Sequence, residues 1–129
     1  MKESDFQCTN PSLVSINFKE NKDFVVDDGK GIEIGTSINV SHSFISDNEV
    51  VVSLTIKLGT EDSSTPFFLV SEYMANFRWM EGFEKEQIDL LVSQNAPALL
   101  LSYARPIISM TTNASHYPAY NIPFINFTK

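Results

Sequence analysis

Two adjacent segments of the chain alternate between apolar and polar residues, and this alternation restricts the fold more than any other feature. Residues 32–44 and 49–58 carry apolar side chains at most second positions, and a Ser-Asp-Asn turn separates them at 46–48. A period of two places the apolar side chains on one face of a β-strand. The two segments therefore predict an antiparallel hairpin with one apolar face and one wet face.

Two further strands are predicted on either side of this hairpin. Residues 13–18 alternate in the same way, whereas residues 66–80 are apolar on both faces. One face of the later strand carries aromatic and aliphatic residues at odd-numbered positions, and the other face carries Phe68, Val70 and Met74. Because an apolar outer face needs a cover, the pattern predicts self-association through this strand.

The segment between the first two predicted strands, residues 19–31, is long for a loop. It is charged and contains glycine, yet it includes the apolar run Phe24, Val25 and Val26. Loops of this length are usually disordered or functional. Two interpretations remain open: Phe24 anchors the loop in the core, or the apolar run binds a partner.

Two helices are predicted after the strands. The first covers residues 84–93, with Ile88, Leu91 and Val92 as its apolar side and acidic residues in its first turn. The second covers residues 96–112. Four strands followed by two helices predict an α+β fold in which both helices pack on one face of a four-stranded antiparallel sheet. All 129 residues are expected to form a single domain.

The second predicted helix is unusually apolar. Asn95 or Ser93 suits its N-cap, Pro97 suits its first turn, and Pro106 predicts a kink because it has no N–H to donate. Two interpretations remain open: the helix is buried in a core, or one apolar stripe packs on the sheet while another faces a partner. The two stripes are Leu100, Tyr103, Ile107 and Met110, and Leu101, Ala104 and Ile108.

Acidic residues outnumber basic ones. The net charge is −7, and all sixteen acids lie at or before Asp89. Nonspecific binding to nucleic acid or to anionic membranes needs a basic surface, so neither is expected. No segment has the apolar length of a signal peptide or of a membrane-spanning helix. We expect a cytoplasmic protein without membrane insertion, whose charge-attracted partners are basic.

Residues suited to catalysis or metal binding are sparse. Cys8 is the only cysteine, which excludes an intramolecular disulfide and a cysteine-based zinc site. His42 and His116 are the only histidines, and they lack the spacing of a metal motif. A nucleophilic pair of Cys8 with a histidine requires proximity that the sequence does not reveal. We expect no enzyme, no metal site and no cofactor.

The last third of the chain resembles a known family. Residues 97–105 read PALLLSYAR, residues 107–110 read IISM, a Tyr-Pro pair stands at 117–118, and residues 121–127 read NIPFINF. This pattern is similar to the C-terminal signature of the SecB family of protein-export chaperones. The Phe-Leu-Val run at the start of the fourth predicted strand fits the same family.

The resemblance implies a chaperone. Members of the family assemble as dimers of dimers and act as ATP-independent holdases, which keep unfolded precursor proteins from folding or aggregating before export. Their client groove lies between the helix layer and the loop that joins the first two strands. Carried onto this sequence, the groove residues are Phe18, Phe24, Val25, Val26, Tyr117, Pro118 and Tyr120. The corresponding oligomer contacts are Val70, Glu72, Met74, Ile88 and Leu91.

The partners implied are unfolded polypeptides and the translocation ATPase. The acidic contact of the family for this ATPase falls at Ser71 by direct alignment, with Glu72 beside it. Typical members also continue past the Asn-Phe tail into another helix, whereas this sequence stops at Lys129. Some members guard an antitoxin instead. An alternative therefore stays open: a dedicated chaperone or binding module for one client, such as an antitoxin, without docking to the export motor.

Overall fold

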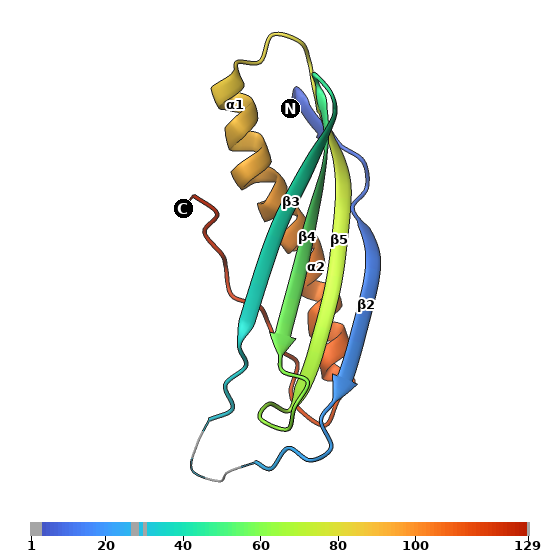
Figure 1. The fold of residues 1–129 in the computed structure, drawn as a ribbon, viewed down its shortest axis with the longest axis vertical. Coiled ribbons are helices and arrows are strands. Elements are labelled where there is room, and N and C mark those ends of the chain that lie inside the picture. Colours follow the sequence, from blue (N-terminus) through green and yellow to red (C-terminus); the bar gives the residue numbers. More distant parts are fainter. Residues whose placement is uncertain (1–3, 27–28, 30, 129) are drawn as a thin grey trace.

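The computed structural model describes residues 4–26, 29 and 31–128. An antiparallel sheet forms one layer, and a helical rod packs on one face of it (Figure 1). The strand order is β1-β5-β4-β3, and β2 also pairs with β5. The predicted α+β fold is confirmed. The elements are β1 (Phe6–Cys8), β2 (Ser12–Glu20), β3 (Thr36–Ser46), β4 (Glu49–Gly59), β5 (Phe67–Trp79), α1 (Lys85–Leu90), the π-helical turn η1 (Leu91–Asn95) and α2 (Ala96–Asn113).

The described sheet has five strands, one more than predicted. The additional strand, β1, has three residues and pairs Phe6 with Trp79 at the end of β5. The Phe6 ring stacks on the rings of Phe77 and Trp79, at centroid distances of 5.4 and 6.2 Å. Three residues are too few to show a period of two. Aromatic stacking on β5 stabilises this strand instead.

The core lies between the sheet and the rod. Every second residue of β4 from Val50 to Leu58 is completely buried, and the odd-numbered residues of β5 are at most 3% exposed. The even-numbered residues of β5 point to the opposite face, where they are half-buried or exposed. The predicted division of both strands into two faces is confirmed.

The edge strand β3 differs from its prediction. It begins at Thr36, so Ile32 and Ile34 belong to the preceding loop, in which residues 27, 28 and 30 lie outside the described part. Val40 and Phe44 share the core-facing side, yet they are 39% and 50% exposed. The reason is that α2 packs over β4 and β5 and leaves the edge strand uncovered.

The two predicted helices form one continuous rod from Lys85 to Asn113. The prediction of an N-cap at Asn95 or Ser93 is wrong, because Asn95 has helical dihedral angles (φ −70°, ψ −44°) and Ser93 lies within η1. At the end of η1 the Ala96 N–H donates to the Leu91 carbonyl, five residues back. This wider turn accommodates the next residue, Pro97, which has no N–H to donate.

One side of α2 packs on the sheet and another stays open. Leu99, Tyr103 and Met110 are 39%, 40% and 71% exposed, and we call these three residues the open stripe. One packed and one open side are present, but they are not the two predicted stripes, because Leu100 is completely buried and Ile107 packs against the core. Within the described ranges, no helix has both the length and the apolarity that a membrane crossing requires. The packed side consists of Leu100, Leu101, Ala104 and Ile108.

Candidate functional site

The loop after β2 meets the turn after α2 at the lower end of the fold (Figure 1). Glu20, the last residue of β2, accepts a hydrogen bond of 2.8 Å from the backbone N–H of His116. Both carboxylate oxygens also lie within 2.9 Å of His116 Nδ1. Beside this pair, the rings of Phe24 and Tyr117 meet edge to face at 6.1 Å. The predicted approach of these two segments is thus present.

The contact between Glu20 and His116 has an electrostatic signature. The backbone hydrogen bond from His116, followed by the contact with its ring, holds the pKa of Glu20 below the ordinary value of 4.5. The carboxylate lies at the surface, so salt screens its interaction with the imidazole. Because the two residues are 96 positions apart, the pair fixes the loop against the turn.

The seven predicted groove residues divide into two groups. Phe18 packs against the core with its ring 5.4 Å from Phe67, and Tyr120 also packs there. The Tyr120 hydroxyl bonds Thr36 Oγ1 at 3.0 Å, and its N–H donates to Thr112 Oγ1. These two aromatic residues are anchors. The other five form what we call the loop–turn surface: Phe24, Val25, Val26, Tyr117 and Pro118.

The loop–turn surface exposes apolar atoms on both of its segments. Val25 is 81% exposed and Val26 is 49% exposed on the loop side, and Pro118 is exposed on the turn side. Between them, Phe24 and Tyr117 are half-buried against each other. Such an arrangement offers nonpolar contact without any directional chemistry.

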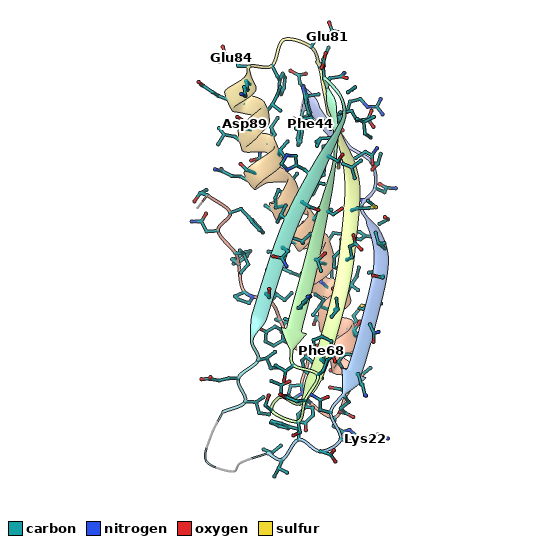
Figure 2. The ribbon with its side chains drawn as sticks, in the orientation of Figure 1. Lys22, Phe44, Phe68, Glu81, Glu84 and Asp89 are labelled. Atoms are coloured by element: carbon teal, nitrogen blue, oxygen red, sulfur yellow. The ribbon has the colours of Figure 1, made fainter. Side chains whose placement is uncertain are left out.

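The core-facing side of β3 is a second apolar surface, which the sequence reasoning missed. Val40 and Phe44 are exposed there, and the Phe44 ring stands edge-on to Trp79 at 6.2 Å. Phe44 lies at the upper end of the sheet, opposite to Phe68 at the lower end (Figure 2). Among the described strands, β3 pairs with β4 alone, so its other backbone edge is open. The signal was available, since residues 36–46 contain no Pro, Asp, Glu, Lys or Arg.

The tail after α2 turns back beside the rod (Figure 1). Arg105 Nε donates to the Ile122 carbonyl at 2.9 Å, and its guanidinium lies 4.7 Å from the centre of the Phe124 ring. Ile122 is completely buried, whereas Phe124 is 90% exposed. A groove of about 560 Å³ remains between the tail and the start of α2, with Leu99 in its wall. The tail is therefore anchored at Ile122 and open beyond it.

The predicted oligomer contacts lie on two different faces. Val70, Glu72 and Met74 point away from the rod and are half-buried, and Ile88 and Leu91 are half-buried on the rod itself. The direct alignment of the ATPase contact needs a correction. Ser71 is completely buried on the core-facing side of β5, so Glu72 is the residue of this pair that reaches the outer face.

Polar clusters of the kind that bind metals do not occur within the described ranges, where no group of three His, Cys, Asp or Glu side chains converges. Cys8 is exposed on β1. Burial raises the pKa of Tyr73, whose hydroxyl lies inside the core.

Comparison with known proteins agrees with the sequence signature. The family model described as preprotein translocase subunit SecB matches residues 14–129. The chain belongs to the SecB family. The protein-export protein SecB of Marinobacter nauticus is 30% identical over 99 residues, which cover 74% of this chain and 58% of that protein. SecB of Haemophilus ducreyi is 28% identical over 79 residues, 61% of this chain and 46% of that protein. The chain thus spans about half the length of these curated relatives.

Solved structures share the SecB fold. A SecB-like chaperone of Mycobacterium tuberculosis, in complex with a ChAD peptide from an antitoxin, superposes with a TM-score of 0.73 at 13% identity. The match covers 93% of this chain and 90% of that one. A Streptococcus agalactiae protein of unknown function gives a TM-score of 0.55 at 15% identity, with 92% and 97% covered. At these identities the likeness concerns the fold alone.

Proposed function

We propose that the chain is an ATP-independent holdase that binds extended, unfolded segments of other proteins. One observation carries the proposal: the loop–turn surface collects exposed apolar side chains from two distant segments onto a rigid sheet and rod. Membership of the SecB family supports the same function.

The binding energy is hydrophobic. A client side chain that covers the loop–turn surface removes apolar area from water on both partners, at roughly 25 cal/mol per Å². The half-buried rings of Phe24 and Tyr117 offer flat faces that accept many side-chain shapes. The surface therefore favours client segments that contain apolar and aromatic residues, and it does not require one particular sequence.

The open backbone edge of β3 supplies the directional part of client binding. An extended client segment that pairs with this edge gains backbone hydrogen bonds that are independent of its sequence. Its alternate side chains then face Val40 and Phe44 on the core-facing side. Edges of this kind usually carry charged residues that prevent pairing. Residues 36–46 have none, which supports a role in strand addition.

We further propose that the protein assembles as a dimer of dimers. Two surfaces suit contacts between copies: the outward residues Val70, Glu72 and Met74, and the rod with Ile88 and Leu91. The rod also carries the open stripe of α2, whose side chains are more exposed than the half-buried Val70 and Met74 on the sheet. Buried apolar area is the main stabilising term in such assemblies, so the rod is the stronger choice.

Two classes of client are compatible with the proposed holdase. Protein export by the SecB relatives suggests precursor proteins in the cytoplasm, with the translocation ATPase as a partner. The antitoxin peptide bound to the M. tuberculosis structure suggests one dedicated client. A general holdase binds several unrelated unfolded chains at similar strength, and a dedicated module does not.

The deciding test is suppression of aggregation of two unrelated unfolded proteins, without nucleotide, at increasing amounts of the full chain. Suppression of both near a stoichiometric ratio is the expected result. Suppression of one alone would favour the dedicated module. Suppression of neither, in a folded protein by circular dichroism, would overturn the holdase function.

A further inference from the structure

The outer face of the sheet carries a groove that the loop–turn surface does not use. Its volume is about 690 Å³, and it lies on the side of the sheet opposite to the rod, at the end marked by Phe68 (Figure 2). The residues that line it come from β2, β4, β5 and the loop after β4. They are Ser15, Ile16, Asn17, Lys19, Lys57, Glu61, Phe68 and Val70.

The strand register places one lysine on each side of an apolar pair on β5. Lys19 on β2 is opposite Phe68, and Lys57 on β4 is opposite Val70. Residues directly opposite in antiparallel strands point to the same face. Phe68 and Val70 are half-buried between the two exposed lysines. The outward face of β5, near the start of the strand, thus presents an apolar floor with a cation on each side.

The charge of this groove is opposite to that of the chain. Two of its lining residues are basic and only Glu61 is acidic, on a chain with a net charge of −7. Among the described residues, neither Lys19 nor Lys57 takes part in an ion pair. Glu72, the next acid on this face of β5, is opposite Ser15 and Thr55.

We propose that this groove docks an acidic, apolar segment of a protein partner. The two lysines are separated by two strand spacings across the sheet and by two residues along the strands. This amounts to roughly 12 Å between their Cα atoms. Two turns of an α-helix cover about 11 Å. A helix lying across the strands therefore sets two carboxylates, seven residues apart, against Lys19 and Lys57. An apolar side chain between the carboxylates covers Phe68 and Val70.

The proposed occupant differs from the client. Clients of the loop–turn surface are selected by apolar content, whereas this groove selects negative charge around one apolar anchor. A client and an acidic partner are therefore expected to bind at the same time, because the two sites share no residue. The inference does not depend on the holdase function, because it uses none of the loop–turn residues. It shares Val70 with the sheet surface named above for contacts between copies, so it requires those contacts to lie on the rod instead.

The test uses three fluorescent amphipathic peptides and the unaltered chain. The first peptide has two glutamates seven residues apart with leucine midway, the second has lysines in place of the glutamates, and the third has serine in place of the leucine. Fluorescence anisotropy is expected to show that the first binds at least tenfold more tightly than the other two. Its affinity should fall as salt increases, because exposed ion pairs are screened.

The matched variants are Lys19→Glu with Lys57→Glu, and Lys22→Glu as the control. Lys22 is exposed in the loop after β2 and does not line this groove. The double variant is expected to lose at least tenfold in affinity for the first peptide, and the control is expected to change it less than twofold. Equal binding by the double variant, or equal binding of all three peptides, would overturn the proposal.

Light scattering of the same variants separates a partner from a second copy of this chain. The mass is expected to be unchanged in Lys19→Glu with Lys57→Glu. A lower mass would show that the groove is a contact between copies and would overturn the docking proposal. Aggregation suppression by these variants is expected to equal that of the unaltered chain, so loss of docking and loss of holdase function are told apart.

Discussion

Replacing Val25 and Val26 by serine is the most direct perturbation of the loop–turn surface. Complete burial of a valine side chain stabilises a complex by about 1.5 to 3 kcal/mol. Val25 is 81% exposed and Val26 is 49% exposed, so a client is able to bury most of the first and half of the second. At the lower end of the range, the pair contributes about 2 kcal/mol, or roughly thirtyfold in client affinity.

The assay is fluorescence anisotropy with a labelled, unfolded segment, supported by aggregation suppression. The double variant Val25→Ser with Val26→Ser is expected to bind about thirtyfold more weakly and to unfold at the same denaturant midpoint, because exposed substitutions change stability little. Val14→Ser on β2 is the matched control for Val26→Ser, since Val14 is 47% exposed. Client affinities that are the same for Val14→Ser and Val26→Ser would refute the placement of the client at the loop–turn surface.

Three further outcomes are expected. Tyr117→Ala should weaken client binding by tenfold or more without loss of the fold, and unchanged binding in the anisotropy assay would count against the edge-to-face pair as a contact site. Met110→Asp should lower the mass in light scattering more than Val70→Asp, because Met110 is 71% exposed and Val70 is half-buried; the reverse order would assign the copy contacts to the sheet. The lowered pKa of Glu20 means that its contact with His116 stabilises the fold above pH 4.5 and that this contribution is lost as the pH falls through the lowered pKa. The protection factor of the His116 amide, which removes the intrinsic pH dependence of exchange, should therefore fall on acidification, and Glu20→Gln should remove that fall; a protection factor that still falls with pH in Glu20→Gln would contradict this origin.

Much of the fold is predictable because the core strands follow one rule. In β4 and β5, alternate residues are buried from end to end, so the period of two read from the sequence is also the period of burial. The edge strand β3 has the same period, but burial fails there because α2 does not reach it. The sequence pattern reports which face a side chain occupies, and neighbouring layers decide whether that face is covered.

The helical rod shows where local signals mislead. Asn95 followed by a proline two residues later is a good start signal for a helix. In the structure the preceding helix runs directly into the same position, and the π-helical turn absorbs the missing donor of Pro97. Continuous packing on the sheet outweighs the local preference for a break. A single sequence carries no sign of this choice, since both arrangements place the same residues on the apolar side.

The sequence predicted which segments approach each other at the candidate site, but it did not predict their side-chain contacts. The SecB resemblance pointed to the loop after β2 and to the turn after α2, and the structure joins them through Phe24 and Tyr117. It also shows that Phe18 and Tyr120 serve as anchors, which depends on side-chain packing that no motif encodes. The pairing of Glu20 with His116 links positions 96 residues apart and is likewise invisible in the sequence.

The distribution of charge along the chain explains how the tail is held. No acid follows Asp89, so Arg105 has no carboxylate partner within its own segment. It uses the Ile122 carbonyl and the Phe124 ring instead, two acceptors that remain available at any pH. An acid beside the open stripe or the tail would place a charge on surfaces where the chain needs apolar contact. The acids are therefore concentrated in the first two-thirds of the chain, while the last third carries the apolar side chains that pack on the sheet and line the open stripe.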